Sequence, residues 1–163
     1  KIAKVTVAYL NMQIAAGVNA VQLFDSWALA LSWNDYTEFS HRYNTEIISQ
    51  LNRKDIPVIS FCKGSSVFAP LMAEAKPDVV SIDWNADLLN IKNILPAGMA
   101  VQGNLDPHIL YADKPVIKKH ILQLFERMRG EKGFIFNLGH GIMPDIPFDH
   151  VKYAIDVVKD FKY

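Results

Sequence analysis

The sequence of 163 residues predicts an α/β fold built on a parallel sheet of five strands. Five short runs are almost continuously apolar, which is typical of strands buried on both faces, and helical patterns separate these runs. The runs begin on average about 28 residues apart, close to the roughly 31 residues that each unit of a (β/α)8 barrel uses. An open, doubly wound sheet has a similar spacing, so periodicity alone leaves both architectures open.

The elements are expected in the order of one helix followed by five strand–helix pairs. Apolar side chains at a helical period predict the opening helix, namely Ile2, Val5, Tyr9 and Met12. The five strands are expected at Ala20–Phe24, Pro57–Phe61, Val79–Ile82, Met99–Gln102 and Phe134–Asn137.

Three further sets of apolar residues at helical spacing predict later helices: Tyr36, Phe39, Tyr43, Ile47 and Leu51; Ile117, Ile121, Leu124 and Met128; and Val151, Ile155, Val158 and Phe161. The pair Asp106-Pro107 predicts a helix start, because the aspartate can cap the first turn and the proline gives up no needed donor. No linker or low-complexity segment divides the chain, so residues 1–163 are expected to belong to one domain.

The composition limits the classes of function. Seventeen basic residues balance seventeen acidic ones, so charge gives no reason to expect binding to nucleic acid or to an anionic membrane. No apolar run is long enough to span a bilayer. The single cysteine, Cys62, rules out an intramolecular disulfide and favours a reducing compartment, so we expect a cytoplasmic protein.

The carboxyl ends of the strands are where parallel α/β folds place their working residues. Among these ends, His140 is the leading candidate, because an imidazole can donate a proton near neutral pH or bind a carboxylate. Its neighbours Gly139 and Gly141 leave it room to face a pocket, although a histidine that merely fixes a loop is the alternative. The other histidines fall in helical or loop patterns and are expected at surface or core positions: His41, His108, His120 and His150.

Other strand ends supply weaker candidates. The Ser26 hydroxyl can hydrogen-bond a substrate carboxylate or cap a turn. Gly103 and Asn104 precede the expected helix start, where free backbone N–H groups suit an anion. Lys63 can face an anionic ligand or pair with a carboxylate, and Asp83-Trp84 can form a pocket wall or simple core packing. No nucleotide or metal-binding motif is present, so no bound metal is expected.

Three strings in the sequence point to a known family: VQLFDSW at 21–27, VQGNLDP at 101–107 and FNLGHGIMPD at 136–145. With them the chain resembles uroporphyrinogen decarboxylase, the haem-pathway enzyme, over essentially all its residues, but it matches only the C-terminal part of that family. The resemblance implies that the five strand–helix units belong to a (β/α)8 barrel whose first three units are absent from this chain. It therefore favours the barrel over the doubly wound sheet.

The resemblance also implies a carboxy-lyase that removes the four acetate carboxyl groups of uroporphyrinogen III and gives coproporphyrinogen III. A protonated pyrrole ring can itself accept the electrons that decarboxylation leaves, so no cofactor is expected. In the family, the histidine at the position of His140 lines the substrate pocket, and the serine at the position of Ser26 contacts substrate. The aspartate that stabilises the cationic ring and several arginines lie in the half of the family that is missing here, so the fragment alone is expected to be inactive. The resemblance also implies that the complete enzyme is a homodimer.

Two alternatives from other classes remain. Methyltransferases that act on corrinoid proteins look similar over this stretch and bind zinc through an H-x-C string and a later cysteine. In this chain the H-x-C string is replaced by Ser60, Phe61 and Cys62, and the later cysteine is replaced by His140. Two possible ligands remain, Cys62 and His140, whereas a catalytic zinc needs three. A non-catalytic binding module is the other alternative, which the two exposed edges of an incomplete barrel disfavour.

Overall fold

The computed structural model describes residues 1–162 and contains one parallel sheet with the strand order β1-β2-β3-β4-β5. The strands are β1 (Val21–Asp25), β2 (Val58–Cys62), β3 (Val79–Ser81), β4 (Ala100–Leu105) and β5 (Phe134–Leu138). All four pairings are parallel and join strands that are consecutive in the sequence. The predicted five-stranded parallel sheet with alternating helices is thus confirmed.

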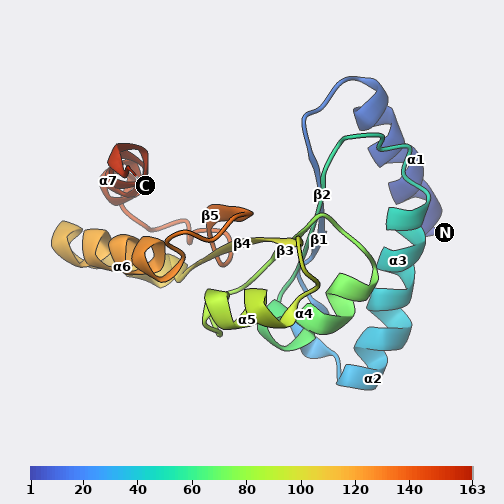
Figure 1. The fold of residues 1–163 in the computed structure, drawn as a ribbon, viewed down its shortest axis with the longest axis horizontal. Coiled ribbons are helices and arrows are strands. Elements are labelled where there is room, and N and C mark those ends of the chain that lie inside the picture. The colour runs from blue at the N-terminus through green and yellow to red at the C-terminus, as the bar shows by residue number, and fades with distance from the viewer. Residues whose placement is uncertain (163) are drawn as a thin grey trace.

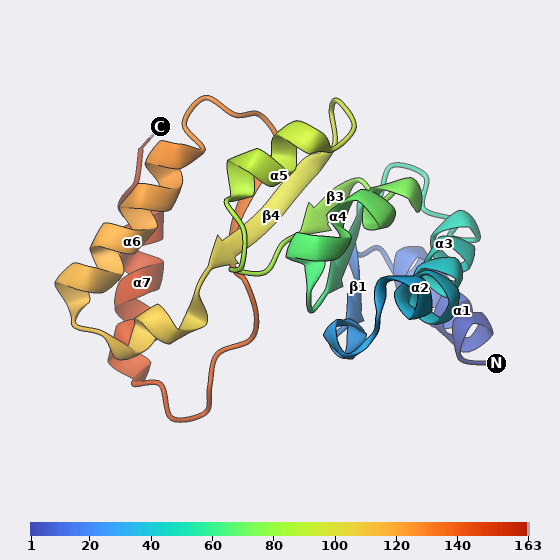
Figure 2. The same ribbon diagram turned by 90° about the horizontal axis from the view of Figure 1, so that it is seen from below.

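The helices lie along an arc around one face of this sheet (Figure 1). They are α1 (Ile2–Ala15), α2 (Trp33–Tyr36), α3 (Arg42–Ser49), α4 (Ser65–Glu74), α5 (Leu88–Ile94), α6 (Lys114–Arg127) and α7 (Phe148–Asp160). Helices α1 to α3 flank the N-terminal strands, α6 and α7 flank β5, and α4 and α5 lie between these groups (Figure 2). Within residues 1–162 no helix covers the opposite face, as expected for part of a (β/α)8 barrel.

The opening helix α1 is confirmed, but the apolar stripe that predicted it faces outward. Ile2 is 84% exposed and Met12 is 60% exposed. The opposite side of α1, which includes Val7 and Leu10, packs on the core instead. Apolar residues occur on every side of this helix, so periodicity could not identify its buried side.

A widened helical turn corrects the second predicted helix. Residues Thr37–His41 form a π-helical turn between α2 and α3. Because this turn holds an extra residue, Ser40 is buried beneath it, whereas Phe39 is 60% exposed although it was expected on the buried side. The Ser40 hydroxyl donates a hydrogen bond to the carboxylate of Asp25 at the end of β1.

The predicted helix start at Asp106-Pro107 is only partly right. The Asp106 carboxylate accepts a hydrogen bond from the backbone N–H of His108 at 2.9 Å, as a capping aspartate should. The segment it caps is a short 3-10 helix, η3 (Pro107–Tyr111), and the long helix α6 begins later, at Lys114.

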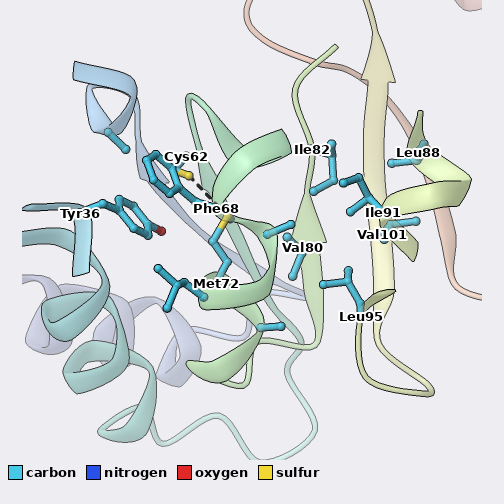
Figure 3. Close-up of a cluster of buried hydrophobic side chains, with 14 of the residues drawn as sticks. Tyr36, Cys62, Phe68, Met72, Val80, Ile82, Leu88, Ile91, Leu95 and Val101 are labelled. Carbon is cyan, nitrogen blue, oxygen red and sulfur yellow. Dashed lines mark hydrogen bonds between the residues drawn. The ribbon is translucent and has the colours of Figure 1, made fainter. Parts of the chain in front are cut away.

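The largest core cluster lies between the sheet and helices α4 and α5 and includes a buried thiol and a buried phenol (Figure 3). Burial raises the pKa of Cys62 to about 12, and it also raises the pKa of Tyr36 above its usual range. The unfolded chain releases these protons near pH 8.5 and 10, roughly the values of free side chains, whereas the folded chain keeps them. Folding stability is therefore lost as pH rises above about 9.

We expect the free energy of unfolding to fall by about 1.4 kcal/mol per pH unit for Cys62 between about pH 9 and 12, and by a similar amount per pH unit for Tyr36 above about pH 10. Urea unfolding at a series of pH values measures this slope. The Cys62→Ala variant removes one group and should show a shallower loss above pH 9. Identical slopes in the two proteins would contradict the assigned cause.

Both edges of the sheet carry apolar side chains. Strand β1 pairs only with β2, and β5 pairs only with β4. Phe24 on β1 is 68% exposed and Ile135 on β5 is 41% exposed. Unpaired backbone groups beside apolar side chains favour pairing with another chain.

The isolated 163-residue chain is therefore expected to sediment as a dimer or larger species at micromolar concentration. The Ile135→Lys variant places a charge on the β5 edge and should reduce this association. Val116→Lys is a matched control, because Val116 is similarly exposed, at 40%, but lies on α6. A monomeric wild-type chain in sedimentation velocity would defeat the expectation.

Candidate functional site

A cavity of about 440 Å³ opens on the face of the sheet that carries no helix. Strands β1 and β5, at opposite ends of the strand order, both contribute to it because the sheet curves. The lining residues are Gln22, Phe24, Ser26, Phe61, Ser81, Asn137, Leu138, His140 and Gly141. The predicted site residues Ser26 and His140 are thus brought together.

His140 lies just after β5 and is half-buried. Its ring meets two aromatic side chains edge to face, Phe61 at a centroid distance of 6.1 Å and Trp84 at 6.2 Å. The hydrogen bonds and ion pairs formed among residues 1–162 include none from the His140 ring. Its imidazole nitrogens therefore remain available to a ligand in the cavity.

Ser26 follows β1 and is exposed at the cavity. The residue before it is held from two sides. The backbone carbonyl of Asp25 accepts a hydrogen bond from the N–H of Lys63 at 3.1 Å, and its carboxylate accepts one from Ser40. Asn44 in turn donates to the Ser40 hydroxyl at 3.2 Å. These contacts fix the backbone from which the Ser26 hydroxyl extends.

The structure places Gly103 and Asn104 inside β4 rather than between a strand end and a helix start, and neither is among the residues that line the cavity. Strand β4 runs on to Leu105, past its predicted end at Gln102. A Cβ at Gly103 would lie 2.6 Å from the backbone oxygen of Ile82, so glycine permits close strand packing there rather than a turn. The Asn104 side-chain amide donates to the carbonyls of Asp83, at 2.9 Å, and Ala86, at 2.7 Å.

The structure also places Asp83 and Lys63, the two other candidates at strand ends. Asp83 is 1% exposed, and its carboxylate accepts hydrogen bonds from the N–H groups of Gly64, at 2.8 Å, and Asn85, at 3.1 Å. It therefore organises the rim rather than forming a pocket wall. Lys63 is half-buried and pairs with no carboxylate in the described part of the chain.

Several lining residues were not identified from the sequence. Gln22 and Ser81 lie within strands, and Gln102 joins them: its amide donates to Ser81 Oγ at 3.0 Å and to Gln22 Oε1 at 3.5 Å. A polar residue inside an otherwise apolar strand was the signal that could have found them. Asn137 gave the same signal at the end of β5.

Among the described residues that line the cavity there is no lysine, arginine, aspartate or glutamate. The lining residues provide amides, hydroxyls, aromatic rings and the imidazole of His140. Such a lining can donate hydrogen bonds to carboxylates and can enclose an apolar ring. It supplies no fixed charge to balance a highly charged ligand.

A metal centre does not fit the residues present. Phe61 contacts His140, and because successive strand residues point to opposite faces, Cys62 points away from the cavity. Its sulfur lies 3.4 Å from Met72 Sδ in the core (Figure 3). No group of three or more His, Cys, Asp or Glu side chains within residues 1–162 is placed to hold a metal ion. The two ligands considered for zinc, Cys62 and His140, therefore do not converge.

None of the helices formed by the described residues is both long and apolar enough to cross a membrane.

Comparison with solved structures shows the fold. A methyltransferase from Methanosarcina mazei superposes with a TM-score of 0.79 at 18% identity, over 98% of this chain and 47% of its own. A putative vitamin-B12-independent methionine synthase from Listeria monocytogenes gives a TM-score of 0.65 at 14% identity, over 99% of this chain and 54% of its own. At such low identities these likenesses concern the fold alone.

Sequence comparison is more specific. Uroporphyrinogen decarboxylase of Protochlamydia amoebophila is 48% identical over 98% of this chain, and that of Trichlorobacter lovleyi is 44% identical over 97%. The chain spans about half the length of these relatives, 44% and 46% respectively. The sequence profile of uroporphyrinogen decarboxylase (URO-D) matches residues 1–161. On this evidence the chain belongs to the uroporphyrinogen decarboxylase family.

Proposed function

We propose that this chain forms one side of the active site of a uroporphyrinogen decarboxylase. The enzyme would remove the four acetate carboxyl groups of uroporphyrinogen III and release coproporphyrinogen III and carbon dioxide. The observation that carries the proposal is the cavity in which Ser26 and His140 meet, in a chain of this family.

The chemistry needs a proton on carbon before carbon dioxide leaves. Protonation of a pyrrole ring carbon gives a cation, and the electrons of the breaking carbon–carboxylate bond then flow into that ring. The exocyclic carbon left behind takes up a proton to become a methyl group, and the first proton leaves the ring carbon. Each acetate thus consumes one proton overall and yields one carbon dioxide.

In this scheme His140 donates a proton or holds a carboxylate, since its nitrogens have no partner among residues 1–162. The Ser26 hydroxyl donates a hydrogen bond to a carboxylate of the substrate. The aromatic ring of Phe61 forms an apolar wall beside them. Gly103 and Asn104, the other two residues predicted to bind substrate, lie in β4, from which the Asn104 amide holds the carbonyl of Asp83.

The direct test is an assay of the protein as its gene encodes it. Uroporphyrinogen III is supplied under anaerobic conditions, and the products are oxidised and separated by the number of carboxyl groups they retain. Successive loss of four carboxyl groups supports the proposal, and unchanged substrate overturns it. Methyl transfer between corrinoid protein and thiol, assayed in parallel, tests the alternative activity.

Ser26→Ala in that protein is expected to raise KM about tenfold with a smaller effect on kcat. The lost hydrogen bond to a charged group contributes about 1.5 kcal/mol to binding before and during reaction. Ser49→Ala is the matched control, because the Ser49 hydroxyl only donates to the carbonyl of Glu46 on the surface of α3. Unchanged KM in the Ser26 variant would remove this residue from the site.

Residues 1–163 are proposed to belong to a single barrel domain of a cytoplasmic homodimer that needs no cofactor and binds no nucleic acid. The balanced charge of the chain supports the lack of nucleic-acid binding, and its single, free cysteine supports the cytoplasmic location.

A further inference from the structure

The orientation of His140 depends on packing rather than on its own hydrogen bonds. The ring has no polar partner among residues 1–162, and glycines precede and follow it in the chain. Its contacts are edge-to-face with two rings, Phe61 and Trp84, the latter at an interplanar angle of 88°. Phe61 is among the residues that line the cavity and Trp84 is not, so the contact with His140 is what connects Trp84 to the cavity.

The backbone that carries His140 also rests on the segment that contains Trp84. The N–H of Gly139 donates to the carbonyl of Leu105 at 2.8 Å. A Cβ at Gly139 would lie 2.6 Å from the backbone nitrogen of Trp84 and 3.0 Å from the carbonyl carbon of Asp83. The loop after β5 therefore touches the Asp83–Trp84 peptide directly, at a distance that only glycine allows.

This peptide is held in place by hydrogen bonds with two other segments, residues 64–66 and strand β4. The N–H of Asp83 donates to Ser65 Oγ at 2.8 Å, and the carbonyl of Asp83 accepts from the Asn104 amide at 2.9 Å. The Asp83 carboxylate accepts from the N–H of Gly64 at 2.8 Å and from the Ser66 hydroxyl. The buried carboxylate of Asp83 has no cationic partner among residues 1–162, and hydrogen bonds from neighbouring turns satisfy it instead.

The indole of Trp84 makes a second contact with a histidine ring. The ring of His108 meets it at a centroid distance of 5.8 Å and an angle of 73°. His108 Nδ1 lies 2.8 Å from a carboxylate oxygen of Asp106, which holds that imidazole. Trp84 therefore contacts two histidine rings, one held by an aspartate and the other lining the cavity.

We propose that Trp84 is a positioning residue that sets the orientation of His140 toward the substrate, and that Asp83 fixes Trp84 in turn. This inference rests on the proposed function of His140. A displacement of about 1 Å of a reacting group can lower a rate about 100-fold, so loss of the indole should affect turnover more than substrate binding.

Steady-state kinetics on the protein as its gene encodes it test this role. Trp84→Leu is expected to lower kcat at least tenfold, per folded molecule, while KM changes less than threefold. Trp84→Phe keeps an aromatic edge against His140 and should recover most of the lost kcat. Trp33→Leu is the control: Trp33 packs on Phe68 with centroids 5.9 Å apart, away from His140, so this variant should keep the wild-type kcat.

A double-mutant cycle separates positioning from a general structural effect. In the His140→Gln background, Trp84→Leu should lower kcat no further, because the group that Trp84 positions is already gone. An equal loss of kcat in both backgrounds, or a wild-type kcat for Trp84→Leu, would overturn the proposal. If His140→Gln itself leaves the rate unchanged, the proposed role of His140 fails instead. Asp83→Asn should lower kcat in the same way and show the same dependence on His140.

Discussion

The 163-residue chain assayed by itself is expected to convert no uroporphyrinogen III above the uncatalysed background. Its cavity offers Ser26 and His140 but no fixed charge, while the substrate carries a carboxylate on every side chain and passes through a cationic ring. Preorganised electrostatic groups are usually the largest catalytic contribution, and removing one donor alone costs about 10²–10³ in rate. A site that lacks the charges needed to balance the substrate and the cationic ring should therefore be catalytically inactive.

Complementation of the chain with a separate N-terminal half tests this expectation. Co-expression of the chain with the N-terminal half of the Protochlamydia amoebophila relative, which is 48% identical over the matched region, should restore measurable decarboxylation. That half assayed alone is the control and should be inactive. Turnover by the isolated chain at a rate comparable to the complemented pair would show that the described cavity is sufficient.

His140→Ala, introduced into the protein as its gene encodes it, is expected to lower kcat by 10²–10⁴-fold, roughly the contribution of a general acid. The protein should remain folded, because the side chain is only half-buried and its removal leaves no polar partner unsatisfied among residues 1–162. Product analysis and thermal unfolding on the same samples measure both effects.

His120→Ala is the matched control, since His120 lies on α6 among the outer helices. It should keep the wild-type kcat. A His140 variant with normal turnover would exclude the residue from the reaction. A loss of activity that follows a large fall in melting temperature would instead support the alternative in which His140 fixes its loop.

The strands were predictable because burial on both faces leaves an uninterrupted apolar run, and a parallel sheet follows from that pattern. The meeting of Ser26 and His140 was predictable for a related reason, since parallel strands bring their carboxyl ends to one rim. Side-chain direction was not predictable. In α1 apolar residues occur on every side, and in the helical region after β1 a π-helical turn places Ser40 inward in place of Phe39.

The role of Gly103 shows a second limit. A glycine after an apolar run is typical of a turn, and this pattern placed the strand end too early. Glycine is needed at position 103 because the chain there passes close to the backbone of Ile82, directly after β3. This contact is close only in three dimensions and cannot be read from the sequence. The role of Asp83 could not be predicted for the same reason. Two groups that donate to its carboxylate, the N–H of Gly64 and the hydroxyl of Ser66, follow β2 and are distant in sequence.

The curvature that brings β1 and β5 to one cavity has a thermodynamic consequence. Ser26 and His140 stand at the two ends of the strand order, so the width of the cavity between them is set by how far the whole sheet bends. A ligand that bridges both residues favours one curvature, and whatever completes the sheet favours a curvature of its own. By linkage, the factor by which sheet completion strengthens ligand binding must equal the factor by which the ligand strengthens sheet completion.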